Sequence, residues 1–134
     1  MKSQNIFAVL LAAIAFVGFA FTTLVDVSVD TSESFVSWKG YKVTGSHHGK
    51  VKLQEGNFAY ENDQLVGGGF VIDMSSIAVE DLQGEYAKKL EGHLKSPDFF
   101  GIEKYPTARF EITKVISRGT PGSYKVIGNL TIKE

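Results

Sequence analysis

The residues of this 134-residue chain best suited to chemistry are its three histidines, His47, His48 and His93. A zinc site needs three or four convergent ligands, and successive residues of a strand point to opposite faces of a sheet. His47 and His48 are adjacent, whereas His93 lies far along the chain. This spacing does not predict a metal centre, and we expect the paired histidines to lie in a loop and to form hydrogen bonds.

Other catalytic patterns are also missing from the sequence. There is no Gly-x-Ser-x-Gly elbow for a nucleophilic serine, and the triple glycine at 67–69 lacks the lysine and strand-to-helix context of a phosphate loop. Glu80 and Asp81 fall at the start of a predicted helix, where carboxylates favour the helix dipole. The absence of cysteine rules out disulfides and thiolate metal sites. The sequence therefore predicts a protein that is not an enzyme and has no metal or cofactor.

The apolar residues are the more informative set, since aromatic residues make up 12% of the chain and ten of them are phenylalanines. A small β-barrel is either filled by its own side chains or holds one slender apolar ligand, and composition does not choose between the two. If there is a ligand, we expect it to contact the apolar residues of the strands and of one irregular segment: Trp38, Phe58, Phe70, Ile72, Phe99, Phe100, Phe110 and Ile112.

Alternating apolar and polar residues predict about six antiparallel strands. Fourteen glycines, some inside these runs, indicate bends of the kind that curl a sheet into a barrel. The strands are expected at 25–30, 34–42, 50–60, 64–73, 107–117 and 124–133, with a loop or bulge at 44–49 and a crossing segment at 74–79. Trp38 is expected in the interior.

One helical insertion is predicted at 80–94, where Leu82, Tyr86 and Leu90 recur at four-residue spacing. Ser96 before Pro97 is then expected to cap a short helical turn around Phe99 and Phe100. The fold class is therefore mainly β, an antiparallel barrel with one helical insertion. A closed small barrel typically has about eight strands, so the chain is expected to be a C-terminally truncated piece that associates through its open edges.

The N-terminus predicts export. Lys2 precedes an uncharged apolar run, and Gly18 and Ala20 are suitably small for cleavage after Ala20. We expect residues 1–20 to be a helical secretory signal and 21–134 the barrel domain, with an uncleaved membrane anchor as the alternative. Without cysteine the chain is not a lipoprotein. Cleavage leaves 13 basic and 15 acidic side chains, a balance without the basic footprint of a nucleic-acid-binding protein. The predicted location is periplasmic or otherwise extracytoplasmic, without stable membrane insertion.

Six sequence pieces together resemble the YceI-like family of exported, lipocalin-like proteins. They are Trp38-Lys39-Gly40, Gly45-Ser46-His47 with Gly49, and the stretches 68–74, 93–100, 104–110 and 128–133. The resemblance implies an extended eight-stranded antiparallel barrel with a helical insertion. It also implies a long apolar tunnel for an isoprenoid lipid, of the polyprenyl phosphate or quinone type.

The chain departs from the family pattern at two places. Gly101 stands where members commonly carry aspartate after the paired phenylalanines, and members continue beyond the point where Glu134 ends this chain. The first hypothesis is a lipid-binding carrier. The alternatives are an envelope enzyme acting on a lipid or quinone-derived substrate, which a pocket joining His47 or His48 to a carboxylate would favour, and a ligand-free structural or stress protein.

Overall fold

The computed structural model describes residues 21–134, so the predicted signal segment at 1–20 lies outside the described part of the chain. The described chain is mainly antiparallel sheet. Its elements are β1 Leu24–Ser28, β2 Phe35–Lys42, β3 Gly45–Glu61, β4 Gln64–Asp73, the 3-10 turn η1 Met74–Ser76, β5 Ala78–Val79, α1 Gly84–Lys95, β6 Thr107–Ser117 and β7 Tyr124–Thr131. The fold class predicted from the sequence is confirmed.

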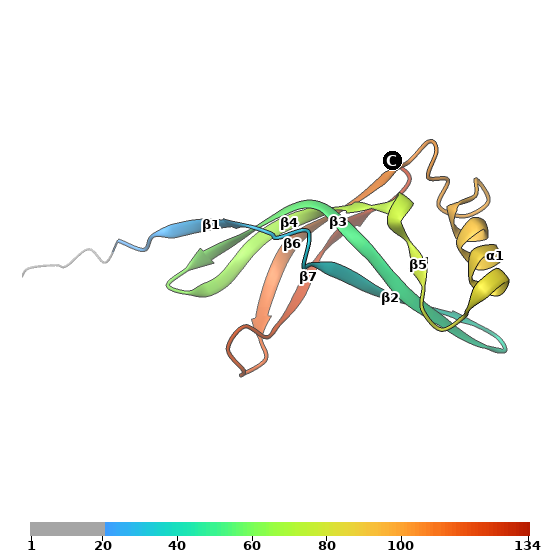
Figure 1. Cartoon of the computed structure of the whole chain (residues 1–134). Helices are drawn as coiled ribbons and strands as arrows, with labels where there is room; N and C mark the ends of the chain where they lie inside the picture. The colour runs from blue at the N-terminus through green and yellow to red at the C-terminus, as the bar shows by residue number, and fades with distance from the viewer. Residues whose placement is uncertain (1–20) are drawn as a thin grey trace, which may run out of the picture.

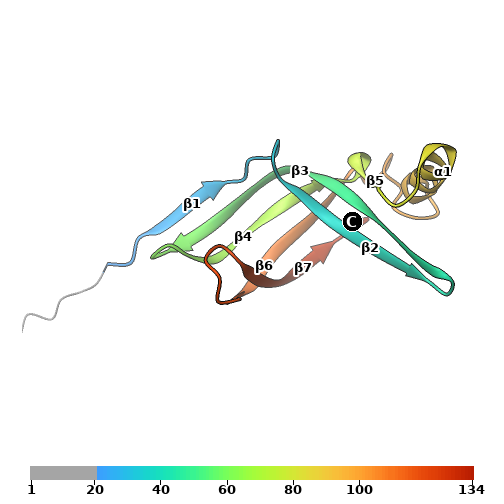
Figure 2. The ribbon, with the colours of Figure 1, turned by 60° about the horizontal axis from the view of Figure 1, so that its bottom comes forward.

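The sheet is built around the 17-residue strand β3, and its main path runs β1-β3-β4-β6-β7. β1 pairs with the second half of β3 and β2 with its first half, while the short strand β5 also pairs with β3. Figures 1 and 2 show a long, twisted and bent sheet with β1 toward one end and α1 at the other. In the part of the chain described here the sheet is not closed, as in an incomplete lipocalin-like barrel.

Two strands begin and end at the residues that the sequence predicted. β4 and β6 have the expected bounds, and Asn62 and Asp63 form the turn before β4 with φ angles of 49° and 60°. Asparagine and aspartate tolerate this left-handed conformation better than other non-glycine residues, so the turn and the register of the hairpin follow from local chemistry.

The predicted loop at 44–49 is wrong, because β3 begins at Gly45 and the turn of its hairpin with β2 lies at residues 43 and 44. Trp38 pairs with Gly49 across this hairpin, and its indole Nε1 donates a hydrogen bond to the carbonyl of Ala78 at 3.2 Å. The absent side chain at Gly49 leaves room for the indole. Residues 45–49 are rich in glycine and histidine, which indicates a loop. They form a strand because the half-buried Trp38 packs against them from β2.

The helix begins four residues later than predicted, at Gly84. Glu80 donates its backbone N–H to the carbonyl of His48, and Asp81 binds the same strand, so both remain outside the helix. The interpretation of these acids as partners of the helix dipole is wrong. No helix among residues 21–134 combines the length and apolar character that crossing a membrane requires.

The segment after the helix also differs from its prediction. Ser96 ends α1 instead of capping a new helix, and its hydroxyl donates to the carbonyl of His93 at 2.7 Å. Residues 97–100 form hydrogen-bonded turns. Gly101 follows with a φ of 56°, a conformation open to glycine, asparagine and aspartate.

The core lies at the helical end of the sheet. Its buried cluster is apolar and joins residues of β3, β4, η1, β5, α1 and β6, together with Ile77 between η1 and β5: Val51, Leu53, Ile72, Met74, Ile77, Val79, Leu94 and Ala108. Phe100 and Ile102 from the loop after α1 pack against this cluster. One end of the sheet is therefore covered by the helix and this loop, and the other end is not.

Candidate functional site

The strand register places six of the eight predicted ligand residues on one face of the sheet. Phe70 pairs with Phe110, and Ile72 pairs with both Leu53 and Ala108. Paired residues share a face, and alternate residues along each strand return to it. We call this surface the apolar face, and its predicted members are Trp38, Phe58, Phe70, Ile72, Phe110 and Ile112.

The centre of the apolar face is a stacked aromatic pair. The ring centroids of Phe70 and Phe110 are 5.3 Å apart, with an interplanar angle of 27°. Glycines lie beside both rings, since a Cβ on Gly56 would be 2.8 Å from Cβ of Phe70 and one on Gly128 would be 2.7 Å from Cζ of Phe110. These glycines let large rings lie flat against the backbone of neighbouring strands.

The apolar face continues to the rim of the sheet, where it is open to solvent. Val25 pairs with Tyr60 and Val27 with Phe58, and these two valines are 49% and 46% exposed. On the opposite rim Leu130 pairs with Phe110 and is 55% exposed. A hollow of about 530 Å³ is lined by Thr23, Val25, Val27, Tyr60, Asn62 and Asp63. The apolar face is therefore open to solvent at both rims of the sheet.

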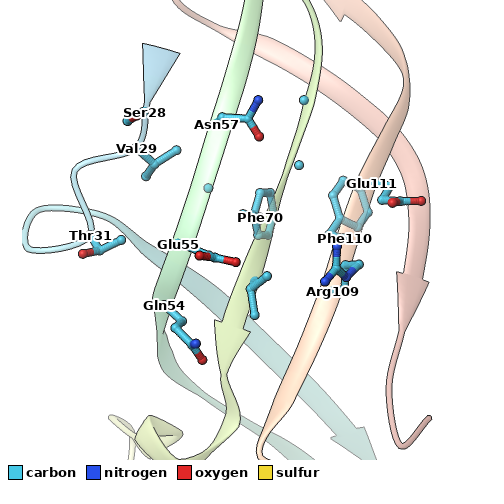
Figure 3. A pocket seen from close by; sticks show the side chains of 14 residues that line it. Ser28, Val29, Thr31, Gln54, Glu55, Asn57, Phe70, Arg109, Phe110 and Glu111 are labelled. Carbon is cyan, nitrogen blue, oxygen red and sulfur yellow. The ribbon is translucent and has the colours of Figure 1, made fainter. Parts of the chain in front are cut away.

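A second groove, of about 640 Å³, lies around Phe70 and Phe110 and has a more polar lining than the sequence predicted. Its polar side chains include Glu55, Asn57 and Arg109 (Figure 3). The register places them on the face opposite the two rings, because Glu55 and Arg109 both pair with Val71, and Asn57 pairs with Gly69. Gly56, Gly68 and Gly69 also line the groove, so the sheet carries no side chains at these three positions. Of the eight predicted ligand residues, only Phe70 and Phe110 line this groove.

Phe99 and Phe100 lie away from the strands, in the loop after α1. Their rings meet edge to face at a centroid distance of 4.7 Å. Phe100 packs against the buried cluster, whereas Phe99 is 44% exposed. Lys133 holds the loop by donating hydrogen bonds to the carbonyls of Phe99 at 3.0 Å and Pro97 at 3.4 Å. The pair is thus anchored on one side and open to solvent on the other.

The structure joins His47 to a carboxylate that sequence reasoning did not connect to it. Nδ1 of His47 lies 2.7 Å from Oδ2 of Asp81, and the other carboxylate oxygen accepts the backbone N–H of His48 at 2.9 Å. The two residues are 34 positions apart, so no local pattern reveals the contact. Neither histidine lines the two grooves described above. Within residues 21–134, no group of three or more acidic or histidine residues is arranged to hold a metal ion.

Asp81 gives the first testable prediction. The hydrogen bond from the His48 backbone, followed by that from the His47 side chain, lowers the pKa of the Asp81 carboxyl below its usual value. A depressed folded-state pKa adds stability that is present above the unfolded pKa, about 3.9, and is lost as the pH falls through the folded value. We expect Asp81→Asn to be less stable at neutral pH and to lose less stability on acidification below pH 4.

Unfolding midpoints measured between pH 7 and pH 2.5 check this expectation, with Asp98→Asn as the control because Asp98 forms no such contact among the described residues. Parallel pH profiles for the wild type and Asp81→Asn would contradict it.

Comparison with known proteins decides the family. A model of the YceI-like domain matches residues 28–134, which is most of the chain and all of its sheet beyond β1. This chain belongs to the YceI-like family. Related members include a UPF0312 protein of Vibrio cholerae, 28% identical over 133 residues, and one of Pseudomonas putida, 29% identical over 110 residues.

The match covers 96% of this chain and 67% of the Vibrio protein, and 79% of this chain and 53% of the Pseudomonas protein. A UPF0312 protein of Photorhabdus laumondii is 31% identical over 85 residues, 63% of this chain and 41% of that protein. This YceI-like chain therefore spans about two thirds of the length of the Vibrio protein and about half of the length of the Pseudomonas protein.

Proposed function

We propose that this chain is an exported lipid-binding protein that holds a long isoprenoid against its apolar face. The observation that carries the proposal is the register, which brings six separately predicted residues onto one surface with Phe70 and Phe110 stacked at its centre. That surface remains open at Val25, Val27 and Leu130, where an elongated apolar molecule has access.

Desolvation supplies the binding energy in this proposal. Each methylene group removed from water contributes about 0.8 kcal/mol, so a chain of several isoprene units needs no catalytic or metal centre to bind. The bent sheet offers branched and aromatic side chains along its length. Discrimination among isoprenoids then depends on the length of the apolar face and on polar groups at its ends.

An envelope enzyme is the second candidate, and the His47–Asp81 contact is the observation in its favour. A carboxylate that orients an imidazole is a common part of acid–base sites. In this chain, however, Asp81 also binds the backbone of His48 and Glu80 donates to the His48 carbonyl. Both contacts fasten the segment before α1 to β3, which accounts for the arrangement without a reaction.

Two substitutions on β7 test the lipid proposal. Leu130 lies on the apolar face at 55% exposure, whereas Ile127 lies on the opposite face at 43% exposure. We expect Leu130→Gln to weaken binding of geranylgeraniol by about tenfold, because apolar contact worth about 1–2 kcal/mol is lost. Ile127→Gln is the matched control and is expected to leave binding unchanged.

Isothermal titration calorimetry on the chain gives both affinities, and circular dichroism confirms that each variant is folded. Equal losses in the two variants, or no binding of the lipid by the wild type, would contradict the proposal.

A further inference from the structure

A groove of about 570 Å³ lies beyond the apolar face, between the end of α1, the loop that follows it and the end of β7. Three lysines line it, Lys95, Lys104 and Lys133. Lys95 ends α1 and Lys104 lies in the loop that follows it, whereas Lys133 comes after β7. Figure 1 shows the chain end lying near the loop after α1. The fold therefore brings the distant Lys133 to the two lysines at the end of the helix and in its loop.

Two of the three ammonium groups lie close to one tyrosine ring. The Nζ atom of Lys104 lies 5.1 Å from the ring centroid of Tyr105, and that of Lys133 lies 5.9 Å from the same centroid. The two charges are therefore at most about 11 Å apart, a separation over which like charges repel in the absence of an anion. The ammonium group of Lys133 donates two of its three N–H groups to the carbonyls of Pro97 and Phe99. These hydrogen bonds fix the position of the ammonium group.

Among residues 21–134, no carboxylate forms an ion pair with any of these three lysines. Among the described residues the ion pairs are His47 with Asp81, Lys50 with Glu80 and Lys88 with Glu85. Glu103 is the one acidic residue that lines the groove, and it approaches none of the three ammonium groups within ion-pair distance. The lining therefore carries an excess of positive charge in a chain whose formal net charge is −1.

The groove also has an apolar side, next to the buried cluster at the covered end of the sheet. Ile102 lines the groove and packs against the buried cluster beneath the apolar face. The exposed ring of Phe99 belongs to the same loop, and its carbonyl is held by Lys133. A ligand with an anionic head and an apolar tail matches this combination of three lysines with Ile102, Pro97 and Tyr105.

We infer that the groove formed by Lys95, Lys104 and Lys133 binds the phosphate headgroup of an isoprenoid phosphate. This inference rests on the proposed function, and it selects a charged lipid over a neutral quinone or alcohol as the ligand. Lysines are well suited to this role, because an ammonium group donates charge-assisted hydrogen bonds to phosphate oxygens. Pro97 and Ile102, which line the groove beside the lysines, are the apolar contacts that the inference assigns to the first isoprene units.

The test compares geranylgeranyl phosphate, geranylgeraniol and inorganic phosphate on the wild type and on the double variant Lys95→Gln/Lys104→Gln. Lys133 is left intact because it holds the loop. We expect the wild type to bind the lipid phosphate more tightly than either other compound. We expect the double variant to lose about a hundredfold in affinity for the lipid phosphate, about tenfold for each charge-assisted contact, and to bind geranylgeraniol as before.

The matched control is Lys88→Gln/Lys89→Gln, two exposed lysines on α1 that do not line the groove. Equal wild-type affinity for the lipid phosphate and the alcohol, or equal losses in the control and test variants, would overturn the headgroup site and leave the lipid-binding proposal standing. Inorganic phosphate binding as tightly as the lipid phosphate would overturn the assignment to a lipid head. Absence of binding of both lipids would overturn the proposed function and this inference together.

Discussion

Gly49→Ala is expected to destabilise the chain by about 3 kcal/mol or more, a large part of the roughly 5–15 kcal/mol that holds a typical domain folded. Gly49 is buried in β3 between Trp38 of β2 and Val79 of β5. A Cβ there would overlap the carbonyl oxygen of Ala78 and lie 2.9 Å from its carbonyl carbon. It would also lie 3.0 Å from Cζ2 of Trp38. The backbone of β5 must therefore move away from β3, which also breaks the hydrogen bond from the Trp38 indole to the Ala78 carbonyl.

Gly67→Ala is the control for this prediction. Gly67 also lies in a strand, but no atom comes within 4 Å of the position of its Cβ, so alanine there is expected to change stability by less than about 1 kcal/mol. Urea unfolding followed by circular dichroism gives both values, and Trp38 fluorescence reports on the environment of the indole. Similar unfolding midpoints for the two variants would contradict the prediction, because they would show that β5 can move away from β3 with little loss of stability.

The strands of the sheet were predictable because their signals are local. β4 and β6 have alternating apolar residues bounded by turn residues, and both were placed at their observed bounds. The Asn62-Asp63 turn fixes one hairpin, and the alternation then determines which residues share a face. For this reason the apolar residues of β3, β4 and β6 could be selected from the sequence and are found on one surface.

The parts that sequence reasoning missed depend on contacts between distant residues. Residues 45–49 are rich in glycine and histidine, yet they form a strand because β2 pairs with them and Trp38 needs the space at Gly49. Asp81 leaves the predicted helix because its carboxylate binds His47 and His48, 34 and 33 positions away. The groove lined by Lys95, Lys104 and Lys133 shows the same limit, since only the folded chain brings Lys133 to the loop that contains Lys104.

The predicted ligand residues divide into two kinds once their burial is known. Ile72 is 6% exposed and belongs to the buried cluster, so its side chain is already covered by protein. Leu130, which was not selected, lies on the same face and is 55% exposed. Apolar alternation identifies the face of a sheet but not how much of that face the helix and its loop cover. Assignment of residues to a ligand therefore requires the covering elements as well as the strands.

This division leads to a stability prediction for Ile72→Ala, which is expected to lower the free energy of unfolding by about 3 kcal/mol. Ile72 is packed between Leu53 and Ala108 on the neighbouring strands. Removing three carbons there costs the lost burial and leaves a cavity, and such changes in cores typically cost about 2–5 kcal/mol. Ile116→Ala is the matched control, since Ile116 is 39% exposed on the opposite face. It is expected to cost less than about 1 kcal/mol.

Ile72→Ala and Leu130→Gln should therefore change different properties, the first the stability of the fold and the second the affinity for the lipid. The first loses stability, and its folded fraction should bind geranylgeraniol almost as the wild type does, because the ligand reaches the exposed part of the face and not its covered end. The second keeps its stability and loses affinity. Chemical unfolding and calorimetric titration of both variants separate the two effects. A folded Ile72→Ala protein that loses as much affinity as Leu130→Gln would place the isoprenoid beneath the helix, inside the cluster that the structure shows as protein core.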